Sequence, residues 1–321
     1  IDEAFLDLTG VAHCMDLEDF GRICQKQIMQ YTGMPVRVGI GPTKTLAKAA
    51  SFGAKKYPAT GGVVDLSLKA RQQKLMHLMP INEIWGVGRR LNKKLNILGV
   101  YSALDLINLD TELVRKRFGI MLVNTIRELR GESCIALEES PTPKKQIVVS
   151  RTFSRRVTEL EFLKEAVSDY AARAGEKLRK EGKSCKLISV FIRTNPFRKH
   201  DIQHREIRSL PFIHPTSDTR DLIQQSKILI EKLYCNGLNY NKVGIMLSDF
   251  SDESIHQLDF FKEKTRCSRD LSVMQMLDGI NQSSCGPVTF LSQGIKKEWS
   301  MKRQLKSPQY TTRIEDLLKV S

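Results

Sequence analysis

Long apolar runs and a leader-like start are both lacking in this sequence. No stretch reaches the roughly 20 apolar residues that a membrane-spanning helix requires. The first residues do not place a basic segment ahead of an apolar one, as a secretory signal does. These absences predict a cytoplasmic protein that does not use a membrane.

Cysteine motifs are lacking as well. The seven cysteines form no CxxC pair and have no histidine at the spacing of zinc ligands. They are Cys14, Cys24, Cys134, Cys185, Cys235, Cys267 and Cys285. This pattern predicts reduced thiols and argues against a zinc site.

Acidic residues are in deficit, with 36 Asp and Glu against 51 Lys and Arg, so the formal net charge is +15. Such a charge favours a polyanionic partner such as nucleic acid, although a merely basic enzyme would show the same balance. Aromatic residues make up only 7% of the chain. We expect four of them in the core rather than as stacking platforms, namely Phe153, Phe191, Phe197 and Phe212.

The length of 321 residues predicts two or three domains. Apolar periodicity predicts a strand over 1–8 and a helix over 17–31. It then predicts a strand over 36–40, which is followed by a turn and a helix over 44–50, and a last strand over 63–66. Residues 68–130 have a helical pattern with short loops. Prolines and charges over 138–145 predict an extended linker.

Beyond the linker, the pattern predicts the order β-α-β-β-α-β, which makes one sheet with two helices on a face. The predicted strands are 147–153, 185–194, 204–210 and 242–250, and the helices are 160–181 and 219–234. After Asp252 the tail is less regular. The predicted fold class is therefore α+β with several domains.

Asp2 and Glu3 are the first candidates for chemistry. Neighbouring residues of a strand point to opposite faces, so a site that uses both must lie where the strand bends or ends. Two hard carboxylates suit Mg²⁺, which prefers oxygen ligands. A solvated strand edge is the alternative interpretation.

The turn Gly41-Pro42-Thr43 leads from a strand into a helix that begins with Lys44. A helix N-terminus offers unpaired N–H groups, and together with the lysine these predict a phosphate site. The turn lacks the form of a P-loop. An ordinary helix start is the alternative.

The string Gly86-Val87-Gly88, flanked by Ile84 and Leu91, matches the hairpin of helix-hairpin-helix DNA binders. Its glycines let the backbone approach a phosphate without reading sequence. The predicted DNA contacts here are Gly86, Gly88, Arg89, Arg90 and Lys93. A tight turn between two helices is the alternative.

Basic residues also fall on the strands of the second α/β region and at their ends, where a charged sheet face would follow a duplex backbone. These residues are Arg151, Arg155, Arg156, Lys183, Lys186, Arg193, Arg198, Lys199, Arg205 and Arg208. The predicted contacts among them are Arg151, Arg155 and Arg156. Each of them taken singly could instead be a solvated surface charge.

Two long motifs, residues 2–5 and 38–51, resemble the S-I-D-E-x-F and S-x-G-I-x-x-N-K-x-L-A-K-x-A-S signatures of Y-family DNA polymerases. The tail segments 299–303 and 307–313 are similar to the C-terminal extension of the UmuC type, which includes MucB and ImpB relatives. The resemblance covers the whole chain. It implies a partial palm (1–70), a helix-hairpin-helix thumb (71–133), a linker (134–146), a β-α-β-β-α-β little finger (147–250) and a C-terminal extension (251–321).

The resemblance implies error-prone translesion DNA synthesis in the bacterial SOS response, by a protein that could be plasmid-encoded. Asp2 and Glu3 would hold catalytic metal in a two-Mg²⁺ site, and Lys44 would contact the incoming dNTP. The segment 257–261 resembles a sliding-clamp motif, with clamp contacts at Gln257, Leu258, Phe260 and Phe261. The other implied partners are primer-template DNA, a processed UmuD-like dimer and the RecA filament.

The chain departs from the family pattern at its start, because the first palm strand with another metal-binding aspartate, and the fingers, are not in the sequence. We therefore expect this segment to bind primer-template DNA without polymerising alone. Two rival functions stay open: a non-catalytic helix-hairpin-helix DNA-binding module, and a metal-dependent structure-specific nuclease.

Overall fold

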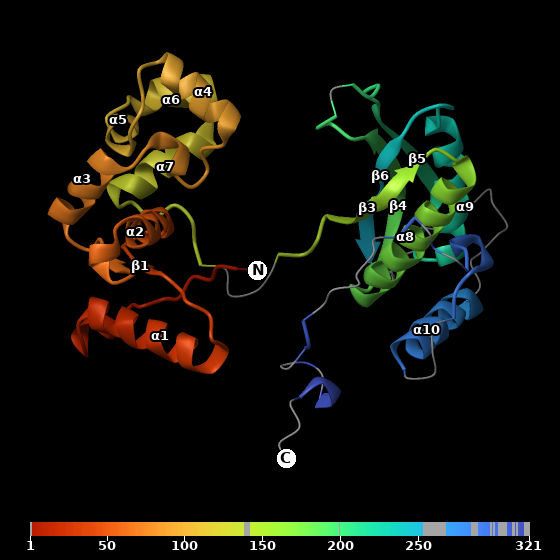
Figure 1. Ribbon diagram of the computed structural model, residues 1–321, viewed down its shortest axis with the longest axis horizontal. Coiled ribbons are helices and arrows are strands. Elements are labelled where there is room, and N and C mark those ends of the chain that lie inside the picture. The colour runs from red at the N-terminus through yellow and green to blue at the C-terminus, as the bar shows by residue number, and fades with distance from the viewer. Residues whose placement is uncertain are drawn as a thin grey trace. The chain divides into compact units, whose positions relative to one another are not determined.

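The computed structural model (Figure 1) describes residues 2–137, 142–198, 200–252, 268–283, 288–295, 297, 299–300, 307–309, 312 and 314–317. Contacts between residues divide the chain into two compact units, Ile1–Pro141 and Thr142–Ser321. Each unit is considered by itself below.

The strand predicted over residues 1–8 is not formed, because residues 2–8 have no regular secondary structure. A β-strand needs a neighbour that satisfies its N–H and C=O groups. The sheet of the first unit consists of β1 (Val38–Ile40) and β2 (Val63–Asp65), which pair in parallel with each other and not with residues 2–8. Period-two alternation alone does not provide a ladder partner.

Helices α1 (Leu17–Thr32) and α2 (Lys44–Lys56) pack against this sheet. Both begin at a side-chain cap, since Asp16 accepts from the N–H groups of Glu18 and Asp19, and Thr43 accepts from that of Leu46. Gly39 permits the close approach of α2 to β1. A Cβ atom there would lie 2.1 Å from the Ser51 nitrogen.

The helical region predicted over 68–130 is confirmed. It contains five α-helices, α3 (Lys69–Leu78), α4 (Arg89–Ile97), α5 (Ala103–Ile107), α6 (Thr111–Phe118) and α7 (Ile120–Arg130). The short 3-10 helices of this unit are η1 (Val11–His13), η2 (Pro58–Thr60) and η3 (Ile81–Glu83). One continuous core, from Leu46 in α2 to Leu129 in α7, joins these helices to the sheet region.

The second unit confirms the predicted order β-α-β-β-α-β. Its elements are β3 (Gln146–Val157), α8 (Leu160–Lys180), β4 (Lys183–Thr194), β5 (Arg205–Thr216), α9 (Thr219–Leu233) and β6 (Tyr240–Asp252). The strands form an antiparallel sheet in the order β3-β6-β4-β5. Figure 1 shows α8 and α9 together on one face of it.

The period-two alternation of the strands separates a core face from an open face. Side chains such as Val190, Ile192, Val243 and Ile245 are buried beneath the helices. The residues between them form the face opposite the helices, which we call the open face. From the strand register, its central positions are Val148, Ser150, Thr152, Ser189, Phe191, Arg193, Arg205, Ile207, Ser209, Lys242, Gly244 and Met246.

Two of the four phenylalanines predicted in the core are there, since Phe153 and Phe212 are buried. The other two predictions are wrong. Phe191 is half-buried on the open face, and Phe197 is 90% exposed. β4 ends at Thr194, so Phe197 lies outside the alternation that turns strand side chains into the core.

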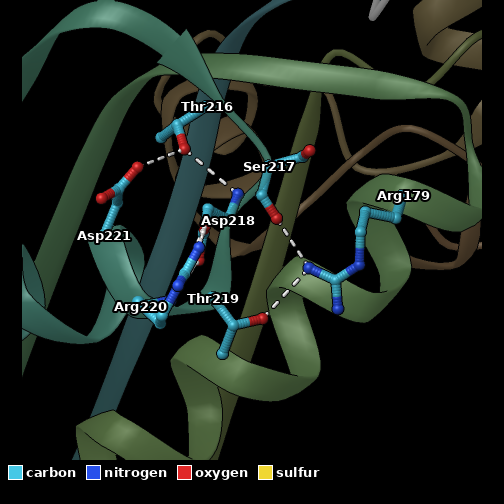
Figure 2. A network of polar contacts seen from close by, with 7 residues as sticks. All are labelled: Arg179, Thr216, Ser217, Asp218, Thr219, Arg220 and Asp221. Atoms are coloured by element: carbon cyan, nitrogen blue, oxygen red, sulfur yellow. Dashed lines mark hydrogen bonds and ion pairs between the residues drawn. The ribbon is translucent and has the colours of Figure 1, made fainter. Parts of the chain in front are cut away.

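The region after β6 is more regular than the sequence predicted. It contains the helix α10 (Ser268–Gln282) and the 3-10 turns η4 (Leu291–Gln293) and η5 (Ile314–Asp316). Arg179 of α8 joins α10 to the layer of α8 and α9. Its Nε and Nη2 atoms donate to Asp278 at 2.6 and 2.7 Å. Its Nη1 atom donates to the Ser217 carbonyl and to Thr219, as Figure 2 shows.

Trp299 provides a second attachment of the C-terminal region. Its ring is 3% exposed and makes edge-on contacts with Phe153 and Tyr170. Its Nε1–H donates to Glu165 at 3.2 Å. This part of the tail therefore contributes to the core of the second unit.

None of the helices in the described part of the chain is long and apolar enough to cross a membrane.

Candidate functional site

A pocket of about 390 Å³ lies at the start of α2 in the first unit. We call it the Lys44 pocket. Its walls come from residues 5–9, from the β1–α2 turn at 39–44, and from residues 133 and 135–137 after α7. Segments far apart in the sequence thus meet around the predicted phosphate-binding lysine.

The ammonium group of Lys44 has two neighbours in this pocket. Its Nζ donates to the Ala136 carbonyl at 2.7 Å and lies 5.2 Å from the centre of the Phe5 ring. The Phe5 ring in turn lies 5.7 Å from that of Trp85. These contacts are a bond to a neutral carbonyl and a cation–π contact. Neither of them neutralises the positive charge of the lysine, which stays available to an anion.

The predicted carboxylates lie beside the same helix. Glu3 accepts from the Lys48 Nζ at 2.5 Å, one turn further along α2 than Lys44. The Glu3 side chain is 65% exposed, and Asp2 is exposed as well. The fold therefore brings the carboxylate pair and the lysine predicted for triphosphate into one region.

The fit of this region to Mg²⁺ is partial. Carboxylate oxygens are ligands that Mg²⁺ prefers, and exposed ones leave positions for substrate oxygens. Glu3 is already paired with Lys48, however, and the described residues gather no group of three or more His, Cys, Asp or Glu side chains that could hold a metal. The described residues here therefore offer the two predicted carboxylates and no third one, which is fewer than a complete site would need.

Glu128, at the end of α7, is a feature that the sequence reasoning missed. Its carboxylate is fully buried and accepts from the N–H groups of Thr45 at 3.0 Å, Cys134 at 2.6 Å and Ile135 at 3.0 Å. Its main-chain carbonyl accepts from the Thr43 hydroxyl at 2.8 Å. One side chain thereby fixes both the β1–α2 turn and the segment that holds Lys44.

The charge of Glu128 is favoured in this setting. Burial by itself raises the pKa of the carboxyl, but the N–H groups of Cys134, Thr45 and Ile135 stabilise the charged form, and together they leave the pKa below its ordinary value. No sequence motif marks Glu128. The only available signal is an acidic residue within the otherwise apolar face of a helix.

The expectation of an open set of N–H groups at the start of α2 is wrong in part. The N–H of Thr45 bonds to Glu128 and that of Leu46 to the capping Thr43 hydroxyl. These two N–H groups are therefore already hydrogen-bonded within the protein and are not open to a phosphate. The phosphate binding predicted for this turn therefore depends mainly on the Lys44 side chain.

The predicted hairpin lies between η3 and α4. Gly86 has a φ of +93°, a left-handed conformation that a side chain would strain, and Gly88 is the N-cap of α4. No side chain caps α4, so its first N–H groups face outward next to the exposed Arg89, Arg90 and Lys93. This geometry can bind a phosphate.

The three arginines predicted on β3 do not lie together on the open face. Arg151 is paired across the ladder with the core residue Val243, so it projects on the helix side of the sheet. The Arg155 guanidinium lies 5.7 Å from the Phe162 ring of α8. Arg156 forms an ion pair with Asp201 at 3.5 Å.

A row of cations crosses the open face instead. Arg193 of β4 lies directly opposite Lys242 of β6 on one side and Arg205 of β5 on the other. The Nε of Arg193 has no hydrogen-bond partner among the described residues. Like charges on neighbouring strands repel, which favours a polyanion above them. Arg193 and Arg205 are among the basic strand residues that the sequence indicates for a charged sheet face, but Lys242 requires the register.

The predicted clamp contacts Gln257, Leu258, Phe260 and Phe261 lie outside the described residues.

Comparison with known proteins gives three family matches. Residues 1–52 match the impB/mucB/samB family, residues 144–260 match the impB/mucB/samB family C-terminal domain, and residues 272–320 match a domain of unknown function, DUF4113. The chain is 46% identical to protein SamB of Salmonella typhimurium over 319 residues, covering 99% of this chain and 75% of SamB. It is 45% identical to protein UmuC of the same species over 322 residues, covering 100% of this chain and 76% of UmuC.

A solved structure described as a Y-family DNA polymerase chimera has the same fold. Its TM-score is 0.58 at 18% identity, over 76% of this chain and 67% of the chimera. At this identity the similarity concerns the fold and not the function.

Proposed function

Because this chain belongs to the impB/mucB/samB family of UmuC-type, Y-family polymerase homologues, we propose that it takes part in error-prone, template-directed DNA synthesis across damaged bases during the SOS response. One observation carries the proposal. Glu3 of the predicted carboxylate pair is ion-paired with Lys48 of α2, one turn along from Lys44, and Lys44 lines a pocket. A nucleotidyltransferase needs anionic metal ligands and a cation for triphosphate in one place.

Asp2 and Glu3 are the residues that would hold Mg²⁺ in this proposal. When bound, Mg²⁺ would activate the primer 3′-hydroxyl and neutralise charge on the leaving pyrophosphate. Lys44 would release the Ala136 carbonyl and bind a triphosphate oxygen, which is a stronger, charge-assisted bond. Lys48 would hold Glu3 in position through their ion pair.

The basic surfaces of both units would bind primer-template DNA. In the first unit the uncapped start of α4, with Gly86, Gly88, Arg89, Arg90 and Lys93, would hold a backbone phosphate. In the second unit the row of Lys242, Arg193 and Arg205 would follow the duplex backbone. Arg151, Arg155 and Arg156 would add contacts at the edge of β3.

Partner proteins follow from the family and not from described contacts. We propose that residues 257–261 bind a sliding clamp, and that a processed UmuD-like dimer and the RecA filament are further partners. Replacing Phe260 and Phe261 by Ala should abolish retention on an immobilised clamp without changing affinity for DNA.

The test is DNA binding by the 321-residue chain in the presence of Mg²⁺, with and without the next correct dNTP. We expect the dNTP to tighten binding to a primer-template, and K44A to remove this effect while the affinity without dNTP is unchanged. K26A, an exposed lysine of α1, is the matched control. We expect no primer extension by the chain alone.

The outcomes separate the rival functions. A non-catalytic helix-hairpin-helix module would bind DNA with no response to dNTP, an interpretation favoured by the pairing of Glu3 with Lys48. A nuclease would cleave the DNA when Mg²⁺ is added. Primer extension by the chain would contradict the expectation that it is inactive alone.

A further inference from the structure

The described residues of the loop between β4 and β5, 195–198 and 200–204, are connected by internal hydrogen bonds. The Gln203 side chain lies within hydrogen-bond distance of three loop carbonyls, those of Asn195 (3.2 Å), Arg198 (2.9 Å) and Asp201 (3.1 Å). The Asn195 side chain accepts from the Phe197 N–H at 3.0 Å. A loop whose carbonyls are satisfied internally keeps its conformation in water.

This loop exposes an aromatic ring. Phe197 is 90% exposed, against 6% for Phe153 and 9% for Phe212 in the same unit. Figure 1 shows the loop projecting beyond the end of the sheet. Single exposed aliphatic side chains are common on protein surfaces. An exposed phenyl ring leaves more apolar surface in contact with water, and a ligand that covers the ring gains the free energy of burying it.

The surroundings of the ring are positively charged. Arg193 and Arg205 stand at the two bases of the loop, and the register places both in one row with Lys242. Arg198 is exposed next to Phe197. Asp201, an acidic residue of the loop, is paired with Arg156 at 3.5 Å. An anionic ligand would therefore be attracted to the ring's vicinity.

We propose that Phe197 is a stacking site for an unpaired base of single-stranded nucleic acid, beside the duplex that the open face binds. An aromatic ring next to cations is the arrangement that holds single strands, because every base has a π-face and every nucleotide a phosphate. A duplex offers no free π-face except at its end. The proposal rests on the proposed DNA-binding function and assigns its loop 195–204 to the single-stranded part of the substrate.

The experiment compares three DNA ligands: a blunt duplex long enough that its two ends are a small share of the binding positions, the same duplex with a single-stranded 5′ overhang, and the overhang strand alone. The variants are F197A, F197W and, as a control, I202A, which removes a side chain that is 73% exposed on the same loop. Both positions are on the surface, so circular dichroism should show unchanged folding for all three variants. Affinities are measured by fluorescence anisotropy, and 2-aminopurine in the overhang reports stacking.

We expect F197A to weaken binding of the overhang duplex and of the single strand roughly tenfold, as loss of one stacked base does, with no change for the blunt duplex. F197W should retain the affinity and the 2-aminopurine signal, and I202A should match the unmodified chain. F197W is needed because the weaker binding of F197A could otherwise be explained by the loss of apolar surface alone.

Three results would overturn the proposal. If F197A weakens the blunt duplex as much as the overhang duplex, the ring contacts paired DNA. F197A could also leave the affinity for every ligand unchanged while R193A and K242A lower the affinity for all three ligands. The open face would then bind DNA without Phe197, and only the stacking proposal would fail. Failure of all three ligands to bind would contradict DNA binding itself, and stacking with it.

Discussion

At the residue scale, the buried carboxylate of Glu128 determines the position of Lys44. It accepts three N–H bonds, two from the segment before Ala136 and one from the first turn of α2. Gln has the same shape as Glu but carries no charge. Its NH₂ group is a donor, so it cannot accept from the N–H groups that one carboxylate oxygen of Glu128 accepts from. We predict that E128Q lowers the opening free energy of both segments by roughly 1–3 kcal/mol. Amide hydrogen exchange of peptides containing Thr45 and residues 133–137 measures it.

E132Q is the matched control, because Glu132 is exposed a few residues away. Exchange in both peptides should be unchanged in E132Q. Equal exchange in E128Q and the unmodified chain would show that these bonds do not hold the segments in solution.

The same carboxylate predicts a pH dependence. The pKa of Glu128 in the folded chain lies below its ordinary value of 4.5, because the N–H bonds outweigh the effect of burial. Its contribution to stability is therefore complete above about pH 4.5 and is lost as the pH falls through the folded value. The difference in hydrogen exchange between the unmodified chain and E128Q should shrink as the pH is lowered below about 4.5. If this difference in hydrogen exchange stays constant with pH, the effect of E128Q comes from the shape of the side chain and not from its charge.

At the element scale, the tail of the second unit is part of its core. Trp299 fills a space beside Phe153 and Tyr170 and bonds to Glu165. We predict that W299A destabilises the second unit by about 3–5 kcal/mol, through loss of the buried ring and the cavity left behind. W299F should cost less, since it keeps the edge-on ring contact and loses only the Nε1–H bond. Hydrogen exchange in α8 and β3 of the full chain measures both.

The control for this prediction is I295A, because Ile295 lies in the same segment but is 90% exposed. Its effect on exchange in α8 should be within error of zero. A small effect of W299A, similar to that of I295A, would mean that the segment is not held against α8.

The elements that could be predicted from sequence are those with a strong contrast between buried and exposed faces. Strands β3 to β6 alternate, and α8 and α9 carry apolar stripes, so all six were found with errors confined to their ends. Residues 2–8 alternate equally well and form no strand, because alternation describes a face and not the partner strand. Phe197 was misplaced because its residue type favours burial, whereas the end of β4 decides its environment.

The candidate site was predictable to the extent that it consists of contiguous motifs. Lys44 and the Gly86–Gly88 hairpin are visible in sequence because turn and cap residues have local signatures. The bonds from Glu128 to Thr45 and to Cys134 join positions that no local pattern connects. The pairing of Lys242 with Arg193 likewise depends on which strands are neighbours.

At the scale of the whole molecule, the question is whether the net charge of +15 acts diffusely or through a defined surface. Binding to DNA releases about 0.9 counterion for each phosphate neutralised, so the slope of log affinity against log salt concentration counts contacts. A triple variant that replaces Lys242, Arg193 and Arg205 by Ala should reduce the magnitude of this slope by about 3. Titration with a duplex at several salt concentrations measures it.

A second triple variant separates the two explanations, because it makes the same change in net charge elsewhere. Lys177, Lys180 and Lys232 are exposed on α8 and α9, on the side of the sheet opposite the open face. If the open face is the DNA surface, their replacement by Ala should leave the slope nearly unchanged, since charges more than about 10 Å from a phosphate are screened at moderate salt. Equal slopes in the two triple variants would mean that the chain attracts DNA by its overall charge and that the cationic row across β6, β4 and β5 has no special part in binding.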